Sequence, residues 1–288
     1  MPYATARDGT KLFVKEWGQG RPVVLIHGWP LSADSWDPVA VPLVEAGHRV
    51  IAYDRRGFGR SDQPWDGYDY DTFADDLASV LEAAEVGDGF ALVGFSMGGG
   101  EVARYLSKHG SDRVDRVALV SSVVPYMLRG EDNPNGVPQS VFDDMAKDMR
   151  DDRAAFFQTF FRSFYGVGII SQPVSNGVIE DSWRQAMMAG LRPTLAAAEA
   201  FATTDFRADL RAFTLPTLII HGTDDATVPI DASGRAAAAA IPHARLIEYD
   251  GAPHGVFASH RERLTADLLE FLGEGQGTAP LRQREDAY

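Results

Sequence analysis

Short, continuous apolar runs recur along the chain, separated by longer stretches in which apolar residues return every three or four positions. The short runs predict strands buried on both faces, at residues 22–26, 48–53, 90–93, 114–121, 215–220 and 245–249. The longer stretches predict helices, at residues 32–46, 71–84, 99–106, 232–241 and 259–272. Strands and helices that alternate in this way form a mostly parallel sheet with helices on both faces, so we predict an α/β fold.

Residues 11–17 follow a different pattern, because their polar and apolar side chains alternate. Such alternation is typical of a strand with only one covered face. The stretch ends at Gly18 and Gly20, and we expect an edge hairpin there.

The alternation of strands and helices stops after residue 125 and resumes near residue 206. In between, helical periodicity covers residues 141–149, 154–165, 179–189 and 193–202, with Pro, Gly and Asn separating the pieces. We therefore predict a core of residues 1–125 and 206–273 that carries a helical lid of residues 126–205. Residues 274–288 are rich in Gly, Gln, Arg and Glu, a composition that predicts a disordered tail.

The composition narrows the class of protein and its partners. Of the 288 residues, 45% are hydrophobic and 24% are charged, as in ordinary soluble globular proteins. The net charge of −14 argues against binding to nucleic acid or to an anionic membrane surface, because both need a positive face. The absence of cysteine excludes disulfides and cysteine nucleophiles.

Residues 1–16 contain no apolar run, and no stretch approaches the length of a membrane span, so we expect a cytoplasmic protein. Whether it forms a homo-oligomer stays open.

One motif carries the candidate chemistry. Gly94-Phe95-Ser96-Met97-Gly98 lies between the strand at residues 90–93 and the helix at residues 99–106. This arrangement is typical of a nucleophile elbow, whose tight turn strains the serine backbone and requires glycine two residues before and after it. The Ser96 hydroxyl would project from the sheet edge above a helix N-terminus, which favours a developing negative charge.

A serine hydroxyl needs a base within hydrogen-bond reach, and the base needs a carboxylate to orient it. In elbow folds the acid and then the histidine follow the serine along the chain. Of the 7 histidines, His254 alone lies in a loop of small residues after the last strand, so it is our candidate base. Asp225 follows the preceding strand and is our candidate acid, with Asp224 as the alternative. We expect His221 to brace the Asp225 loop by hydrogen bonding.

An oxyanion hole needs two backbone N–H groups directed at the developing negative charge. Met97 follows the nucleophile and is placed to supply one, and Trp29 follows His27-Gly28 at the end of a strand and is placed to supply the other. Pro30 lacks an N–H, has a fixed φ and restricts Trp29 to extended geometry, so we expect it to set the direction of the Trp29 carbonyl.

The motifs together resemble the α/β-hydrolase superfamily and, within it, the cofactor-free bacterial haloperoxidases, also called perhydrolases, and the related aryl esterases. The matching segments span the core, at residues 27–30 (HGWP), 54–61 (DRRGFGRS), 94–101 (GFSMGGGE), 221–222 (HG) together with Asp225 and Pro229, and 251–255 (GAPHG). The resemblance implies that Ser96 is the nucleophile, Asp225 the acid and His254 the base, with the Trp29 and Met97 amides as oxyanion donors. It also implies a mechanism that uses no metal, haem or other cofactor.

The resemblance further implies hydrolysis of small aryl or alkyl esters through an acyl-enzyme. With hydrogen peroxide in place of water the product would be a peracid able to oxidise halide, a hypothesis motivated by Pro30. Five residues flank the expected triad and are our candidates for the substrate pocket: Trp29, Pro30, Phe95, Val256 and Phe257. Aromatic residues of segment 156–165 could line an acyl pocket or attach the lid to the sheet.

Two other functions stay open on the sequence alone. A lactonase or γ-lactam amidase would use the same triad on a small ring. A ligand-binding receptor could keep the fold without turnover. Epoxide hydrolases and haloalkane dehalogenases share the fold but need an aspartate nucleophile, so Ser96 argues against them.

Overall fold

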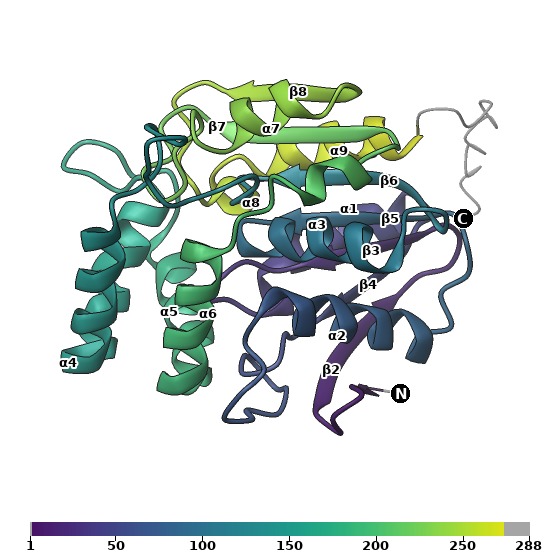
Figure 1. Ribbon diagram of the computed structural model, residues 1–288, viewed down its shortest axis with the longest axis horizontal. Helices are drawn as coiled ribbons and strands as arrows, with labels where there is room; N and C mark the ends of the chain where they lie inside the picture. The colour runs from purple at the N-terminus through teal and green to yellow at the C-terminus, as the bar shows by residue number, and fades with distance from the viewer. Residues whose placement is uncertain (1, 274–288) are drawn as a thin grey trace, which may run out of the picture.

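The computed structural model describes residues 2–273, in which a single eight-stranded sheet forms the centre. The strands lie in the order β1-β2-β4-β3-β5-β6-β7-β8 (Figure 1). Their bounds are β1 Tyr3–Thr5, β2 Lys11–Trp17, β3 Pro22–Ile26, β4 Arg49–Tyr53, β5 Phe90–Phe95, β6 Val114–Val120, β7 Thr217–Gly222 and β8 Ala244–Tyr249. All neighbours from β4 to β8 pair in parallel, whereas β1 and β2 add an antiparallel edge. The predicted α/β architecture is therefore confirmed.

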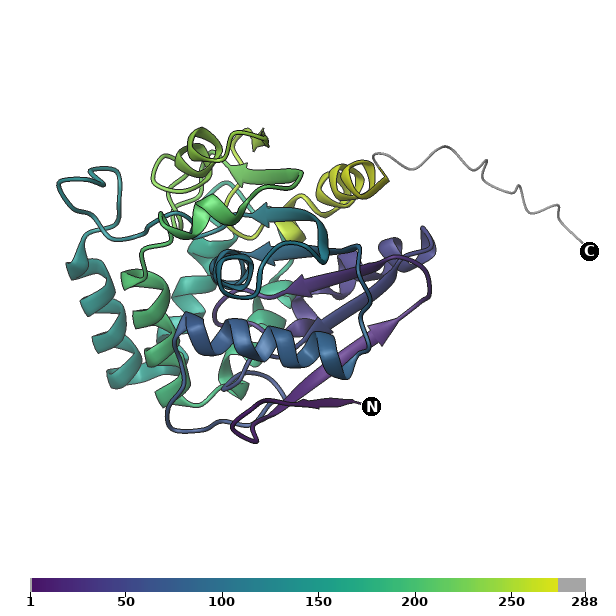
Figure 2. The same ribbon diagram turned by 45° about the vertical axis from the view of Figure 1, so that its right-hand side comes forward.

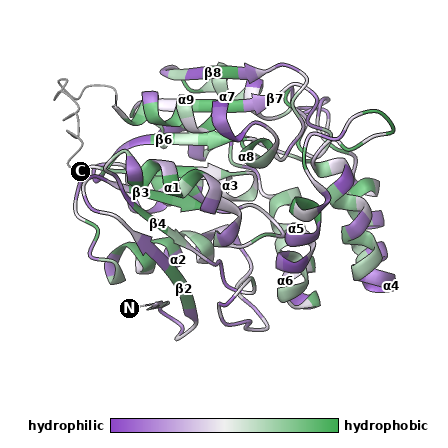
Figure 3. Ribbon diagram, turned by 180° about the vertical axis from the view of Figure 1, so that it is seen from behind, coloured by the Kyte–Doolittle hydropathy of each residue, from purple (hydrophilic) through white to green (hydrophobic). Residues whose placement is uncertain are grey.

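Helices cover both faces of the sheet, which explains the continuous apolar runs of the strands. Every residue of β5 and of β7 is buried. The helices α2, α3 and α7 lie on one face, and α1, α8 and α9 lie on the other (Figures 1 and 3). Their bounds are α1 Asp37–Glu45, α2 Tyr70–Ala83, α3 Met97–His109, α7 Gly234–Ala240, α8 Val256–Ser259 and α9 Arg261–Gly273. No helix of residues 2–273 combines the length and the apolar character needed to cross a membrane.

The expected edge hairpin after residues 11–17 is wrong, although the strand itself is present. β2 pairs with β1 on one side and with β4 on the other, so the hairpin precedes β2 and the outermost strand is β1. After β2 the chain passes beyond β4 to reach β3, and Gly18 and Gly20 allow this close passage. A Cβ at Gly18 would lie 2.4 Å from the His48 carbonyl oxygen, and one at Gly20 would lie 2.2 Å from that of Gly47.

Residues 32–46 form two helical pieces instead of one predicted helix. The 3₁₀ helix η1 covers Ala33–Trp36, and α1 begins at Asp37 with a proline in its first turn. Proline has no N–H to continue a preceding helix but suits the start of a new one, which explains the break. In a similar way, His260 lies between α8 and α9 and not inside the helix predicted for residues 259–272.

Three helices stand between β6 and β7 in the chain, in the segment predicted as a lid. They are α4 Gln139–Phe164, α5 Asn176–Met188 and α6 Leu191–Thr203, and they gather at one end of the sheet (Figures 1 and 2). α4 is kinked at Asp152, whose φ of −155° and ψ of 88° are not helical. The Asp152 carboxylate accepts a hydrogen bond from the Ala155 N–H, so it caps the second half of α4 as a new helix. The two halves correspond to the helices predicted at residues 141–149 and 154–165.

The division into core and lid stays a prediction. The structure shows where these helices lie, and a lid is defined by its movement over the site. A second 3₁₀ helix, η2 at Asp209–Ala212, leads from α6 back to the sheet. The tail predicted at residues 274–288 lies outside the described residues.

Candidate active site

Ser96 occupies the sharp turn between β5 and α3, with φ 53° and ψ −119°. This backbone conformation is unfavourable for any residue except glycine and is typical of a functional site. The glycines around it have no room for a side chain. A Cβ at Gly94 would lie 2.6 Å from the Gly98 carbonyl oxygen, and a Cβ at Gly98 would lie 2.5 Å from that of Ile26. The glycine spacing read from the sequence thus has a steric cause.

The structure brings Ser96, Asp225 and His254 together at the carboxyl edge of the sheet. His254 Nε2 lies 3.0 Å from Ser96 Oγ, and His254 Nδ1 lies 2.6 Å from Asp225 Oδ2. All three residues are buried. Because a carboxylate only accepts hydrogen bonds, Nδ1 carries the proton of a neutral His254 and donates it to Asp225. Nε2 is then free to accept the hydrogen bond from the Ser96 hydroxyl.

The Asp225 carboxylate is fully engaged. Its Oδ1 accepts hydrogen bonds from the N–H groups of Thr227 at 2.9 Å and Val228 at 2.7 Å. Its Oδ2 also lies 3.2 Å from His221 Nε2. Burial acts to raise the pKa of Asp225, but the electrostatic attraction of His254 and the hydrogen bonds from His221 and His254 outweigh it and lower this pKa below its ordinary value. Asp225 is therefore an anion that accepts a hydrogen bond from the imidazole of His254.

The alternative acid does not reach the site. The Asp224 side chain is exposed, and its backbone N–H donates to the Ala252 carbonyl oxygen at 3.1 Å. His221 braces the loop as expected, because its Nε2 lies 2.9 Å from the Val228 carbonyl oxygen. A carbonyl oxygen only accepts, so His221 Nε2 carries the proton and points toward both Val228 and Asp225.

The two expected oxyanion donors lie beside Ser96. Met97 opens α3 directly after it. Trp29 follows Gly28, where a Cβ would lie 2.9 Å from Ser96 Cβ, so only glycine lets this loop approach the serine so closely. Within residues 2–273, neither the Trp29 nor the Met97 amide donates a hydrogen bond to another residue. The peptide bond between Trp29 and Pro30 is cis.

The five candidate pocket residues are all buried around this centre. The Phe95 ring lies 5.0 Å from the His254 ring and 4.9 Å from that of Phe257. Trp29 faces the helical segment, where its ring lies between 5.4 and 5.6 Å from three phenylalanine rings, those of Phe157, Phe160 and Phe201. Its indole N–H donates to the Thr194 carbonyl oxygen at 3.0 Å. That these residues contact substrate stays a prediction.

Two residues of the helical segment make contacts at or near the site. Phe164 belongs to the aromatic segment 156–165 noted in the sequence, whereas nothing in the sequence singled out Gln185. The Phe164 ring lies 4.8 Å from the His254 ring, and its carbonyl oxygen accepts a hydrogen bond from the Gly255 N–H. Gln185 Oε1 accepts hydrogen bonds from both the N–H and the hydroxyl of Ser32. A buried glutamine on an amphipathic helix looks like a surface residue until its partner, more than a hundred residues away in the chain, is known.

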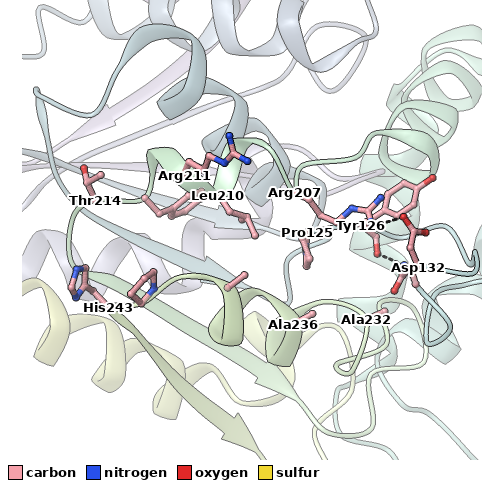
Figure 4. A pocket seen from close by; sticks show the side chains of 14 residues that line it. Pro125, Tyr126, Asp132, Arg207, Leu210, Arg211, Thr214, Ala232, Ala236 and His243 are labelled. Atoms are coloured by element: carbon pink, nitrogen blue, oxygen red, sulfur yellow. Dashed lines mark hydrogen bonds and ion pairs between the residues drawn. The ribbon is translucent and has the colours of Figure 1, made fainter.

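A surface pocket of about 720 Å³ lies apart from these residues, between η2 and α7 (Figure 4). Arg207 lines it, and its guanidinium is engaged by Asp132 and Asp205. Neither the triad nor the Trp29 loop contributes to its lining.

The parallel sheet, the serine elbow and the acid and histidine loops at its carboxyl edge define the architecture of an α/β hydrolase. Residues 21–260 match the family model described as alpha/beta hydrolase fold. The chain therefore belongs to the α/β-hydrolase family.

The relatives narrow the group within this family. The chain is 44% identical to the non-heme chloroperoxidase CPO-A1 of Kitasatospora aureofaciens, a match that covers 95% of this chain and 100% of that protein. It is 42% identical to the bifunctional esterase/perhydrolase DCH of Acinetobacter calcoaceticus, over 94% of this chain and 99% of the relative. The crystal structure of a bromoperoxidase from Bacillus anthracis superimposes with a TM-score of 0.90 at 44% identity, covering 94% of this chain and all of that one. The resemblance to the cofactor-free haloperoxidases is thus confirmed.

Proposed function

We propose that the protein is a serine esterase with perhydrolase activity, in which Ser96, His254 and Asp225 form the catalytic triad. The observation that carries the proposal is the chain of hydrogen bonds that links Asp225, His254 and Ser96, next to the Trp29 and Met97 amides, which donate no hydrogen bond within residues 2–273. The named activities of the chloroperoxidase and esterase/perhydrolase relatives support the same reaction class.

The reaction begins when Ser96 Oγ transfers its proton to His254 Nε2 and bonds to the carbonyl carbon of the ester. The carbonyl oxygen becomes an anion and accepts hydrogen bonds from the amides of Trp29 and Met97. Asp225 stabilises the positive charge on His254 during this step. The tetrahedral species then collapses, the alcohol leaves with the proton from His254, and the acyl group remains on Ser96.

Release of the acyl group decides between two products. Water, deprotonated by His254, attacks the acyl-serine and yields a carboxylic acid. Hydrogen peroxide, deprotonated by His254, attacks in the same way and yields a peracid, because one peroxide oxygen bonds to the acyl carbon, the O–O bond is kept, and Ser96 leaves with the proton from His254. The peracid then transfers an oxygen atom to bromide or chloride in solution, giving hypohalous acid and the carboxylate. Small aryl and alkyl esters are the proposed substrates, because aromatic rings enclose the site on the side of the helical segment.

The test measures hydrolysis of short-chain aryl esters, lactones and lactams by the purified protein, with and without peroxide and bromide. We expect rapid, sustained ester turnover, faster than on lactones or lactams, and bromination of a dye only when an ester or carboxylic acid and peroxide are both present. Ser96→Ala removes the nucleophile and should abolish both activities, while Ser79→Ala on α2, a serine that only bonds to its own helix, should not change them. Full ester turnover by Ser96→Ala would refute the proposal, and a single slow turnover by the wild type would favour a receptor.

A further inference from the structure

A buried network of charged and polar groups lies beneath the loop that carries Trp29. Arg55, Glu101 and His27 are completely buried. Arg55 Nε donates to Glu101 Oε2 at 2.7 Å, and Arg55 Nη2 donates to the His27 carbonyl oxygen at 2.8 Å. The Arg55 backbone N–H donates to His27 Nε2 at 3.0 Å. Arg55 therefore holds both the main chain and the side chain of His27.

These contacts determine the tautomer of His27. Since Nε2 accepts from the Arg55 N–H, the proton of the neutral imidazole is on Nδ1. Nδ1 lies 2.9 Å from the Gly28 carbonyl oxygen and donates to it. Burial, followed by the charge of Arg55, lowers the pKa of His27 well below its ordinary value, which favours this neutral form.

The Gly28 carbonyl and the Trp29 N–H belong to one planar peptide unit. The Gly28 carbonyl oxygen accepts from His27 Nδ1 and also from the Leu31 N–H at 3.0 Å. Two donors on the carbonyl fix the plane of the peptide, and the plane fixes the direction of the Trp29 N–H. Orientation of this oxyanion donor thus depends on His27, and His27 depends on Arg55.

The other member of the ion pair, Glu101, lies on the helix that presents the second oxyanion donor. Glu101 lies on α3, four residues after Met97, and therefore close to it on the same side of the helix. The ion pair between Arg55 and Glu101 consequently joins the segment that presents the Trp29 amide to the helix that presents the Met97 amide.

We propose that the buried Arg55–Glu101 ion pair is a positioning element that holds the two oxyanion donors at their working separation. The inference rests on the proposed function, because it concerns the same site. Within residues 2–273, neither Arg55 nor Glu101 forms a hydrogen bond with Ser96 or His254, so we infer that they act through His27 and through α3.

The composition of the pair favours this role over simple stabilisation. Burial raises the pKa of Glu101 well above its ordinary value and lowers that of Arg55, so each charge needs the other. Glu101 Oε1 is buried without a hydrogen-bond partner in residues 2–273. Buried ion pairs of this kind contribute little net stability compared with apolar residues. Burying the two charges costs desolvation energy and leaves Glu101 Oε1 without a partner in residues 2–273. A role in positioning the Trp29 and Met97 amides explains why the protein keeps such a pair.

The chain offers a matched control next to Arg55. Arg56 forms a two-bonded ion pair with Asp76, at 2.6 and 2.7 Å, and both side chains are 2% exposed. This pair joins a loop to α2, and no hydrogen bond within residues 2–273 links it to the Trp29 loop or to α3. Asp76 also attracts Arg55 electrostatically, and Arg56 has a second partner in Asp8 at 2.8 Å. Asp76→Asn therefore removes a buried carboxylate charge near Arg55, as Glu101→Gln does, but it leaves the hydrogen bonds from Arg55 to His27 and Glu101 in place.

The experiment compares Glu101→Gln with Asp76→Asn in three measurements: the kcat and KM for an aryl acetate, the inhibition constant of a trifluoromethyl ketone, and the melting temperature. Ser96 Oγ adds to the carbonyl carbon of the ketone, and the resulting anionic oxygen lies in the oxyanion hole. The affinity of the ketone therefore measures how well the two donors are placed. We expect Glu101→Gln to lower kcat by roughly 10- to 100-fold, as for a misplaced oxyanion donor. Its KM should stay nearly constant, and its affinity for the ketone should fall by about the same factor as kcat. Asp76→Asn should lower the melting temperature while keeping kcat and ketone affinity close to those of the wild type.

The inference is overturned if Glu101→Gln keeps a wild-type kcat, if its kcat falls without loss of ketone affinity, or if Asp76→Asn loses as much of both. Should Glu101→Gln not fold, Arg55→Lys serves instead, because lysine keeps the charge but cannot bond to Glu101 and the His27 carbonyl in the same geometry. Retention of kcat and ketone affinity by Arg55→Lys would also overturn the inference. Failure of the proposed function is a separate result, since it is read from the wild type and from Ser96→Ala.

Discussion

Replacing Asp225 by asparagine isolates the charge of the candidate acid without changing its size. In the wild type, Oδ1 accepts from the backbone N–H groups of Thr227 and Val228, and Oδ2 accepts from His254. The asparagine oxygen must take the Oδ1 position, because its NH₂ group cannot face two N–H donors. The NH₂ group then faces His254 Nδ1 and donates to it.

This donation reverses the tautomer of His254. With Nδ1 as an acceptor, the proton of the neutral ring moves to Nε2, 3.0 Å from Ser96 Oγ. Nε2 can no longer accept the serine proton, and the positive charge on the imidazole loses its partner. An equivalent change in another serine triad lowers kcat about 10⁴-fold, which corresponds to roughly 5 kcal/mol of transition-state stabilisation.

We therefore expect Asp225→Asn to lower kcat for an aryl acetate by about 10³- to 10⁴-fold with little change in KM. Asp224→Asn is the matched control, because the neighbouring side chain is exposed and should leave kcat unchanged. The melting temperatures of both variants show whether the fold is retained. The reasoning is refuted if Asp225→Asn keeps more than about a tenth of wild-type kcat, or if Asp224→Asn shows a comparable loss.

Three further predictions follow from single features of the structure. Pro30→Leu should lower the ratio of peracid to carboxylic acid formed from one ester in mixed water and peroxide, and an unchanged ratio would remove the reason for linking Pro30 to perhydrolysis. Gly98→Ala places a Cβ 2.5 Å from the Ile26 carbonyl oxygen and should abolish activity or soluble expression, whereas Gly87→Ala, which meets nothing within 4 Å, should be silent in both assays. Because the pKa of Asp225 is lowered by folding, its stabilising contribution is complete above the unfolded value of about 3.9 and declines as the pH falls below it. Urea unfolding should therefore show the advantage of the wild type over Asp225→Asn shrinking between pH 6 and pH 3, and a constant difference would contradict this.

The residues of the proposed triad could be predicted because each lies in a short, local motif. The spacing around Ser96 reflects contacts between neighbours in the chain, and the loops of Asp225 and His254 follow strands whose apolar runs are unmistakable. The order of acid and histidine then assigned the remaining roles, and the exposed Asp224 is the alternative that the structure sets aside.

Other features depend on partners that are distant in the sequence. The three-residue strand β1 is too short to show a pattern, and without it the position of the hairpin was predicted wrongly. Gln185 carries no local sign that it reaches Ser32, and the aromatic segment 156–165 did not show that Phe164 is the ring that meets His254. The Arg55–Glu101 pair was visible only as part of two matching motifs, since nothing in either motif says that a buried arginine meets a buried glutamate.

These contacts divide the site between two parts of the chain. The proposed triad, the amides of Trp29 and Met97 and the Arg55–Glu101 pair all come from the sheet and the elements that flank it. Under the proposed function, these groups would stabilise the transition state. The rings around the Trp29 indole come from α4 and α6, and the hydrogen bond from the Trp29 indole N–H to the Thr194 carbonyl oxygen ties the oxyanion loop to α6. We therefore expect the helical segment to add contacts to the acyl group in the ground state, beside those predicted for Trp29, Phe95 and Phe257. Substitutions there should change KM and the choice among esters, while substitutions under the oxyanion loop should change kcat for all of them.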